Sequence, residues 1–330
     1  MNPKDPSYFA FLVHPLVRWQ RRILGVRLWH LPLLLGRSLR GVDAVGSIGK
    51  LSIPTKNGPV RGTIIAVPDT AQELAENQHR ASALRIRAAE LAESQSVDAI
   101  GLGNALAVVA GRGTELRHSV SVPVTTGHAC TAWTCSSITQ AAMVRHNLHQ
   151  CSVGIVGFKG TVGEAVAMML RDANVSVWVS TSGRAADRAR EMGCHVTTDA
   201  EMYAHCAIVV GASTTGPALD GAKLEKTKVL IDLALPPTLQ RGTRPRGIHV
   251  YAGEPLQVPG RIRTDFFGWI WLKLANYGHG CIYACLAESI IGAVYGPKYC
   301  HTKRRLTKED VTAAGEAIDS LGWTPALRKR

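Results

Sequence analysis

The stretch VGIVGFKGTVGEAVAMML, residues 153–170, carries the strongest structural signal in the chain. A short apolar run reaches Gly157, and the spacing G-x-x-G-x-x-G then opens a segment with helical character. Glycines at this spacing allow a tight turn, let a pyrophosphate approach the backbone and let the helix pack closely on the strand. The helix N-terminus supplies amide donors for the phosphates. The residues predicted to contact a dinucleotide here are Gly157, Gly160, Thr161, Val162 and Gly163.

The sequence around this stretch alternates between short apolar runs and helical segments. The expected helices are 131–147, 162–172 and 184–192, and the expected strands are 152–156, 175–180, 206–210, 228–232 and 248–251. Such alternation is typical of a doubly wound parallel sheet with helices on both faces. We therefore predict an α/β fold with a Rossmann-type parallel sheet, a second α/β domain for the substrate, and C-terminal helices.

The part of the chain before the glycine loop has its own pattern. Residues 44–67 indicate short strands separated by the turn signal Asn57-Gly58-Pro59, and residues 70–95 indicate a helix. The stretch GLGNAL, residues 101–106, also contains G-x-G, but it lacks a third glycine in register. We interpret it as a close-packed turn and not as a second cofactor loop.

The strand after the glycine loop indicates which nicotinamide cofactor would bind. An NAD site usually has Asp or Glu at the end of this strand, where the carboxylate holds the ribose hydroxyls. Here the position offers Ser180, Thr181 and Ser182, then Arg184, with no acid before Asp187. Hydroxyls and a guanidinium suit a 2′-phosphate, so we predict NADPH. An exposed residue in the first helical turn is the alternative for Arg184. The remaining predicted cofactor contacts are Ala212 and Ser213.

Length and charge set the domain organisation and the class of partner. The 330 residues, 46% hydrophobic and 19% charged, suit a folded protein with two domains. We expect an N-terminal substrate and carrier domain over 1–125, an NADP-binding domain over 126–262, and a helical C-terminal segment over 263–330. The net charge is +13, and residues 1–50 and 298–330 hold ten of these charges. A basic surface attracts polyanions, but no nucleic-acid-binding motif is present, so we expect no nucleic-acid partner.

Cysteine spacing and hydropathy bear on metal binding and location. The eight cysteines lack the paired C-x2-C repeat of a zinc site, so no metal is expected. The sequence shows no signal-peptide pattern, so we expect the cysteines to be free thiols in a reducing cytoplasm. The longest apolar candidate, 274–297, is interrupted by polar residues and does not resemble a membrane span. The segment from Tyr8 to Leu39 alternates arginine with apolar residues. This pattern suits either contact with a membrane surface or packing against the body of the protein.

A second stretch, CIYACLAESII at 281–291, joins two cysteines and one acid in an apolar segment. Reduction of an acyl thioester to an aldehyde is served by a thiolate that takes the acyl group before hydride arrives, and a helix N-terminus favours thiolate. Cys285 follows the glycines at 278 and 280, early in the expected helix, and Glu288 shares its face at i+3. Glu288 could orient a proton donor or satisfy a buried amide. Simple packing of a buried cysteine is the alternative.

The chain resembles the long-chain acyl-[acyl-carrier-protein] reductase family, whose members form fatty aldehydes, and the resemblance runs nearly end to end. The matching stretches are FLVHP (11–15), VRGTIIAV (60–67), TTGHACTAW (125–133), VGIVGFKGTVGEAV (153–166), VLIDLALPPTL (229–239), YACLAES (283–289) and TAAGEAIDSLGW (312–323). The family's A-C-x-A-E motif is matched at 284–288. The resemblance implies that Cys285 accepts the acyl group and that NADPH supplies the hydride.

The chain departs from the family pattern at two places. His128 stands where Asn is usual, and Cys130 stands where His is usual. The stretch from Leu233 to Pro237 replaces a glycine-rich turn. His128 is the best-placed imidazole to deliver a proton to the developing aldehyde oxygen, with a structural hydrogen bond as the alternative.

Aromatic and basic residues suggest the substrate and its carrier. The segment 266–271 concentrates four aromatic residues before the cysteine, as a groove for a fatty acyl chain would need, although ordinary core packing is the alternative. Acyl carrier proteins are acidic, so we expect the basic ends to steer one toward this protein. The residues predicted to contribute are Arg18, Arg21, Arg22, Lys303, Arg304 and Arg305.

Two other functions fit the same residues. One is a dehydrogenase of a small hydroxy or keto acid, related to shikimate-type enzymes, in which Cys285 is structural. The other is a regulator that binds NADPH without chemistry. Acyl chain length and the choice between carrier protein and coenzyme A do not follow from the sequence.

Overall fold

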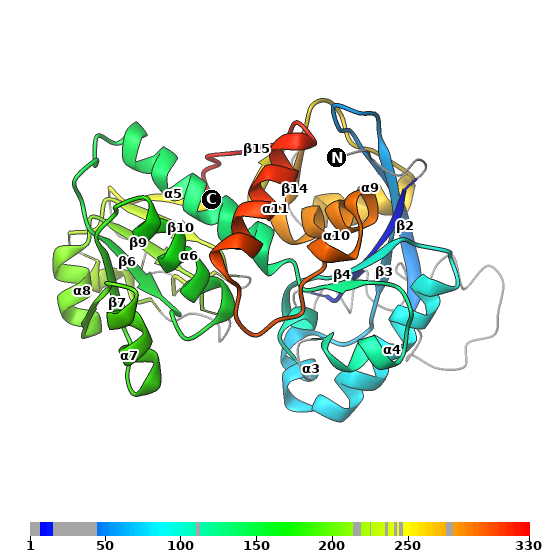
Figure 1. The fold of residues 1–330 in the computed structure, drawn as a ribbon, viewed down its shortest axis with the longest axis horizontal. Helices are drawn as coiled ribbons and strands as arrows, with labels where there is room; N and C mark the ends of the chain where they lie inside the picture. The colour runs from blue at the N-terminus through cyan, green and yellow to red at the C-terminus, as the bar shows by residue number, and fades with distance from the viewer. Residues whose placement is uncertain are drawn as a thin grey trace. The chain divides into compact units, whose positions relative to one another are not determined.

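The computed structural model describes residues 7–15, 45–109, 113–213, 219–224, 226–234, 237–240, 243, 247–274 and 280–330 (Figure 1). The chain divides into two compact units. Unit 1 comprises Met1–His128, Gln257–Arg304 and Glu316–Thr324, and unit 2 comprises Ala129–Leu256, Arg305–Gly315 and Pro325–Arg330. The segments predicted from the sequence do not coincide with these units, because residues 263–330 are divided between both.

Unit 2 contains a six-stranded sheet in which every pair of neighbours is parallel. Its strands are β6 (Val153–Val156), β7 (Val177–Ser180), β8 (His195–Thr197), β9 (Ile208–Gly211), β10 (Val229–Asp232) and β11 (His249–Ala252). They lie in the order β11-β10-β9-β6-β7-β8. The first strand in the chain is therefore central, and the later strands are added first on one side and then on the other. This is the strand order of a Rossmann-type dinucleotide-binding domain, as predicted.

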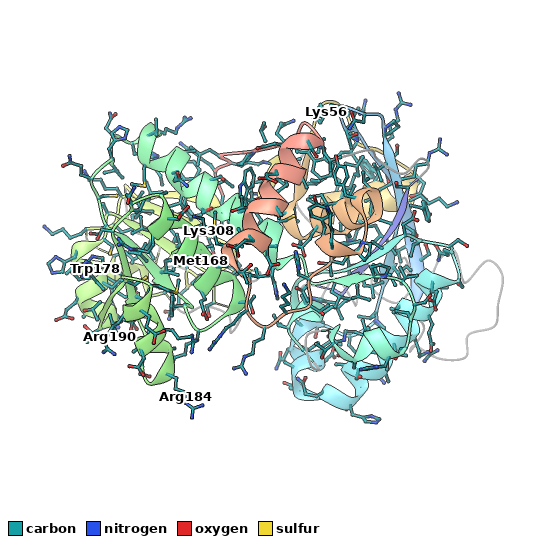
Figure 2. All side chains as sticks on the ribbon, viewed as in Figure 1. Lys56, Met168, Trp178, Arg184, Arg190 and Lys308 are labelled. Carbon is teal, nitrogen blue, oxygen red and sulfur yellow. The ribbon has the colours of Figure 1, made fainter. Side chains whose placement is uncertain are left out.

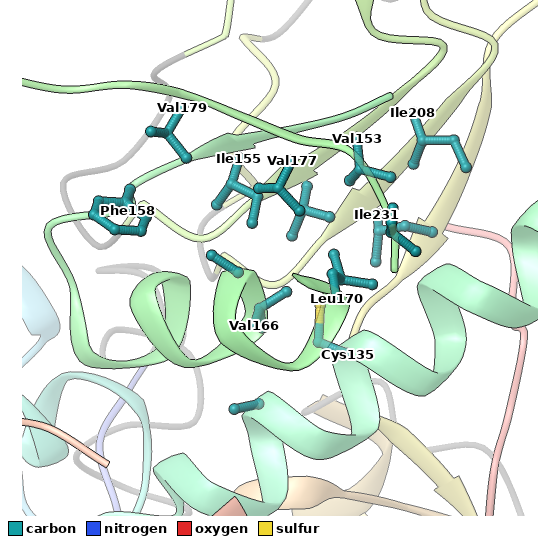
Figure 3. Close-up of a cluster of buried hydrophobic side chains, with 14 of the residues drawn as sticks. Cys135, Val153, Ile155, Phe158, Val166, Leu170, Val177, Val179, Ile208 and Ile231 are labelled. Carbon is teal, nitrogen blue, oxygen red and sulfur yellow. The ribbon is translucent and has the colours of Figure 1, made fainter. Parts of the chain in front are cut away.

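Helices and apolar side chains give unit 2 its core. The helices are α5 (His128–Arg145), α6 (Thr161–Asp172), α7 (Arg184–Glu191), α8 (Asp199–His205) and the first part of α11 (Lys308–Ser320). The central strands are nearly continuous apolar runs, as expected for a parallel sheet covered on both faces. Figure 3 shows Val166 and Leu170 of α6 beside Val153 and Val177 of the sheet, all of them buried.

Unit 1 contains a second six-stranded sheet, with the order β13-β2-β3-β1-β4-β5. Its strands are β1 (Tyr8–Val13), β2 (Gly46–Ile53), β3 (Val60–Ala66), β4 (Ala99–Leu102), β5 (Val124–Thr125) and β13 (Arg263–Thr264). β1 is parallel to β3 and β4, and β2 is antiparallel to β3 and β13. The helices α3 (Ala71–Glu76), α4 (Gln78–Glu93), α9 (Phe266–Leu274) and α10 (Ala284–Tyr295) belong to this unit. The second α/β domain is therefore confirmed.

The remaining described elements are short. They are the 3-10 helices η2 (Asn104–Ala107), η4 (Glu115–His118), η5 (Gly221–Lys223) and η6 (Pro297–Tyr299), and the strands β12 (Pro255–Gln257), β14 (Cys281–Tyr283) and β15 (Thr324–Pro325). Within the described residues, no helix is long and apolar enough to cross a membrane.

Three local differences from the sequence-based expectations have physical reasons. The helix expected over 70–95 is interrupted at Asn77, whose side chain accepts a hydrogen bond from the backbone of Arg80 and so starts α4. The start of the segment Tyr8–Leu39 is the buried central strand β1, and residues 16–39 lie outside the described part of the chain. The short elements β8 and α8 were not expected, since neither has an apolar run long enough to be recognised.

The buried acid Glu254 makes the stability of unit 2 depend on pH. Burial raises the pKa of Glu254 from 4.5 to about 7, a shift that the Arg330 guanidinium opposes and Asp232 increases. The folded state therefore holds this proton more tightly than the unfolded chain. Its free energy of unfolding falls as the pH rises from about 4.5 through about 7, because the folded protein must then ionise a buried acid. Between about pH 5 and about pH 8 we expect the unfolding free energy to fall by about 2–3 kcal/mol more than in Glu254→Gln, measured by urea titration. Parallel pH profiles for the two proteins would contradict this expectation.

Candidate functional site

The glycine loop of unit 2 turns as its spacing predicts. After β6 the chain turns at Gly157, where φ is +93°, and the Gly160 amide donates to the Gly157 carbonyl at 3.0 Å. A side chain on Gly157 would place its Cβ 2.7 Å from the carbonyl carbon of Ala212, and one on Gly163 would overlap the Gly157 carbonyl oxygen. Glycine is therefore required at both positions. Gly160 precedes α6 and makes no side-chain cap, and the N-terminus of a helix after such a loop is where a phosphate binds in this fold.

The predicted cofactor residues after β9 lie beside this loop. The Ala212 amide donates to the carbonyl of Val156 at 2.9 Å, and a Cβ on Gly157 would also meet the Ser213 nitrogen at 2.9 Å. The strand order reverses between β6 and β9, and dinucleotides bind at the carboxyl ends of the strands where this reversal occurs. Thr161 and Val162, the first two residues of α6, are at the same end of the unit. The structure thus brings these predicted residues together.

The end of β7 offers polar groups to a ribose or its phosphate. Ser180 is the last residue of β7, and the buried Thr181 hydroxyl has no hydrogen-bond partner among the described residues. The Lys159 ammonium donates to the Ser182 hydroxyl at 3.3 Å. Arg184 begins α7, is exposed, and is directed away from the ribbon in Figure 2. The sequence-based prediction did not include Lys159, although its position between two motif glycines was a usable signal.

Cys285 lies in unit 1, at the second position of α10. Strand β14 leads into this helix, and the N-cap residue Tyr283 makes no side-chain cap. The electrostatic field at a helix N-terminus stabilises thiolate. Of the eight cysteines, only Cys151 and Cys285 are partly exposed, and the other six are buried. Cys285 therefore combines access with a helix N-terminus.

Burial makes several other thiols poor nucleophiles. Desolvation raises the pKa of Cys194 to about 11 and that of Cys206 to about 12. Desolvation also raises the pKa of Cys135 and of Cys151. These four groups are protonated at neutral pH, and the thiolate is the reactive form.

Glu288 holds the backbone that contacts Cys285. Its carboxylate is 1% exposed and accepts a hydrogen bond from the Thr125 hydroxyl. The Thr125 oxygen in turn accepts from the amides of Gly127 at 3.2 Å and His301 at 3.3 Å. A Cβ on Gly127, where φ is +74°, would lie 2.5 Å from the Cα of Cys285. Glu288 therefore acts through Thr125 to fix the loop against the cysteine.

The imidazole of His128 is oriented by a neighbouring threonine. The Thr126 hydroxyl donates to the His301 carbonyl at 2.9 Å and lies 3.0 Å from His128 Nδ1. One hydroxyl proton serves one acceptor, so Nδ1 carries the proton that it donates to Thr126. In the neutral ring, Nε2 is then the acceptor. The sequence-based prediction missed Thr126 and His301, and no motif marked His301.

The predicted substrate residues lie in different environments. On α9, Phe266 is 66% exposed and Trp269 45% exposed, whereas Trp271 is buried with its edge toward Phe11. Phe266 and Trp269 share one face of the helix and their rings stack with centroids 6.4 Å apart, whereas Trp271 lies on the buried side. The basic residues Lys303, Arg304 and Arg305 are exposed, and Arg18, Arg21 and Arg22 lie outside the described residues.

Comparisons with known proteins give distant similarities and show no family. No protein-family model matches the chain. A curated relative, the aminotransferase PigE of a Serratia strain, is 25% identical over 197 residues, which cover 56% of this chain and 23% of the relative. The chain thus spans less than a quarter of that protein. Membership of the acyl-[acyl-carrier-protein] reductase family is not shown.

The solved structures that resemble the chain include dehydrogenases. An L-tryptophan dehydrogenase from Nostoc punctiforme is 13% identical, with a TM-score of 0.38, covering 96% of this chain and 81% of that one. A shikimate 5-dehydrogenase from Thermus thermophilus, in complex with NADP(H) and shikimate, is 18% identical, with a TM-score of 0.37 and coverage of 75% and 87%. At this distance neither assigns an activity. The strand order of unit 2 itself shows the Rossmann-type fold of dinucleotide-binding domains.

Substitution of Glu288 tests its positioning role. Glu288→Ala removes the closer acceptor of the Thr125 hydroxyl and leaves the His301 carbonyl at 3.4 Å, so we expect a loss of about 1–3 kcal/mol of unfolding free energy and an altered rate of Cys285 alkylation. Glu288→Gln retains an acceptor oxygen and should lose less than half as much. Urea unfolding and iodoacetamide labelling followed by peptide mass measure the two effects. Equal losses in both variants would show that the carboxylate charge matters and the hydrogen bond does not.

Proposed function

We propose that the protein is an NADPH-dependent reductase that converts a long-chain acyl thioester to a fatty aldehyde through an acyl-enzyme on Cys285. The observation that carries the proposal is a partly exposed cysteine in the first turn of α10, held against a fixed glycine loop, in a chain that also contains a dinucleotide-binding unit. The resemblance of the motifs at 125–133 and 283–289 to acyl reductases supports the same chemistry.

The chemistry divides into two balanced steps. In the first, the Cys285 thiolate attacks the thioester carbonyl, a new carbon–sulfur bond forms, and the carrier leaves as a thiolate that takes up a proton. When bound, NADPH supplies the hydride that reduces the enzyme thioester. The carbon–Cys285 bond then breaks, which releases the aldehyde and returns the cysteine as thiolate. The amides at the start of α10 are candidates to stabilise negative charge on the carbonyl oxygen. The His128 imidazole can do so only when both of its nitrogens are protonated, because Nε2 of the neutral ring is an acceptor.

The residues of unit 2 fit a dinucleotide. Close backbone packing at Gly157 and Gly163 gives the tight turn and the close contact of helix and strand that a dinucleotide-binding loop requires. The exposed Ser182 hydroxyl and the exposed cations Lys159 and Arg184 suit a phosphorylated ribose. These features support NADPH over NAD, since the end of β7 offers no carboxylate for two free ribose hydroxyls.

A dehydrogenase of a small hydroxy or keto acid is the alternative function. The solved structures named above fit this alternative better than acyl-thioester reduction, since their names include tryptophan and shikimate dehydrogenases. In that case Cys285 is structural and its removal leaves activity intact. A third possibility, an NADPH-binding regulator, predicts binding of the cofactor without its oxidation by any thioester.

An acyl-transfer experiment tests the proposal. Mixing the protein with a long-chain acyl carrier protein in the absence of NADPH should add one acyl mass, measured on the intact protein. The adduct should be absent in Cys285→Ala, and addition of NADPH should discharge it as aldehyde. Cys151→Ala, which removes the other partly exposed thiol, is the matched control and should behave as wild type. No adduct and no aldehyde from carrier or coenzyme A thioesters would favour the two alternatives.

Charge reversal tests the carrier. Replacing the exposed Lys303, Arg304 and Arg305 by glutamate should raise the KM for a carrier-bound substrate about tenfold while the KM for the matching coenzyme A thioester changes by less than about twofold, because acidic carriers depend on steering. Arg87→Glu, on the exposed face of α4, serves as a single-site control for charge reversal. Equal losses on both substrates would contradict carrier docking at these residues.

A further inference from the structure

The structure assigns to Lys159 the recognition of the 2′-phosphate of NADPH, a role that rests on the cofactor of the proposed function and that makes this residue the determinant of NADP over NAD. The inference starts from the conformation of the glycine loop, where Lys159 lies between Gly157 and Gly160. It does not depend on what unit 1 reduces.

The residue before Lys159 fixes the direction of its side chain. Phe158 is 1% exposed and belongs to the core of unit 2, where Figure 3 shows it near Val179 of β7. With Phe158 inserted into the core and Gly160 starting α6, the side chain between them is left on the surface. Lys159 is indeed exposed, and the packed phenyl ring fixes the loop from which it projects.

The ammonium group lies at the end of β7. Lys159 Nζ is 3.3 Å from the Ser182 hydroxyl, two residues beyond the last residue of that strand. In this fold, the end of the second strand contacts the ribose of the adenosine, and an acid there would select NAD. Here the same place holds a cation and the hydroxyls of Thr181 and Ser182. A phosphate on the ribose can accept from the exposed Lys159 ammonium and the exposed Ser182 hydroxyl.

Nearby acids are already paired with arginine. Glu164 of α6 forms ion pairs with Arg188 at 3.2 Å and Arg305 at 3.8 Å, and Asp187 of α7 pairs with Arg190 at 3.0 Å. Among the described residues, no carboxylate pairs with Lys159. Its charge is therefore available to an anion, with the neutral hydroxyl of Ser182 as its hydrogen-bond partner.

Arg184 is in a weaker position for the same phosphate. It is exposed at the start of α7 and directed outward in Figure 2. The chain reaches it through Gly183, which has φ of +60° and open space around the position that a Cβ would take. We therefore expect a smaller contribution from Arg184 than from Lys159, because Lys159 already contacts Ser182 at the end of β7, whereas Arg184 is directed outward.

Equilibrium binding tests the assignment without any turnover. Dissociation constants of the full-length protein for NADPH and NADH are measured by nicotinamide fluorescence, and those for 2′,5′-ADP and ADP by calorimetry. Wild type should prefer NADPH at least about tenfold. Lys159→Ala should raise the dissociation constants for NADPH and 2′,5′-ADP about 10- to 100-fold, the range expected for loss of a hydrogen bond to a charged group. The dissociation constants for NADH and ADP should change by less than about twofold.

Control variants separate recognition from folding. Lys159→Arg should retain most of the wild-type affinity for NADPH. Arg184→Ala should lower the affinity for NADPH less than Lys159→Ala does. Lys228→Ala removes an exposed lysine that precedes β10. This residue lies at the amino ends of the strands, whereas the cofactor is expected at their carboxyl ends, so the variant should leave all four affinities unchanged. Each variant is also checked for an unchanged thermal unfolding midpoint.

The outcomes distinguish this inference from the proposed function. Three results would each overturn the role of Lys159. Lys159→Ala could weaken the binding of NADPH and NADH equally, it could affect the binding of neither, or the wild type could show no preference for NADPH. If Cys285 takes no acyl group while Lys159→Ala still weakens NADPH selectively, acyl reduction fails and the assignment of Lys159 stands.

Discussion

The close packing of backbone at Gly157 is the constraint on which the dinucleotide-binding unit depends. At this residue the chain leaves β6, turns with positive φ and passes within contact distance of the backbone that leaves β9. Any side chain there would separate the two strands at the point where their order reverses. The same packing brings Gly163 onto the Gly157 carbonyl and so fixes where α6 begins. The start of α6 and the position of Ala212 both follow from that one approach.

A second constraint of the same kind shapes unit 1. Gly127 lies against the backbone of Cys285, and Thr125 holds Gly127 in place by bonding to a buried carboxylate on α10. Both sites thus use glycine to bring two backbones together, but they are stabilised differently. Apolar packing supports the loop of unit 2, whereas a buried polar network supports the loop of unit 1. Such a network specifies one geometry strongly, because each unsatisfied member would be costly in a desolvated environment.

Local patterns predicted the parts of the structure that depend on local chemistry. The strands of unit 2 could be expected because they are short apolar runs between helices, and Gly157 and Gly163 could be expected from spacing. The contact of Lys159 with Ser182 could not, since it depends on how far a side chain reaches across a loop. The contact between Thr125 and Glu288 joins residues 163 positions apart, and nothing in either local sequence records the pairing. The strand β8 has too few apolar residues to be distinguished from a loop.

The division of unit 1 among separate segments has a consequence for how the protein folds. Residues 1–128 supply most of its sheet, yet β13 and α10 come from residues made after the whole of the sheet in unit 2. During synthesis on the ribosome, residues 1–128 therefore lack β13 and α10 until after the strands of unit 2 have been made. Long separation in sequence slows such pairing and exposes apolar surface in the interval. The nascent amino-terminal segment is therefore the part of this protein for which binding by a chaperone would matter most.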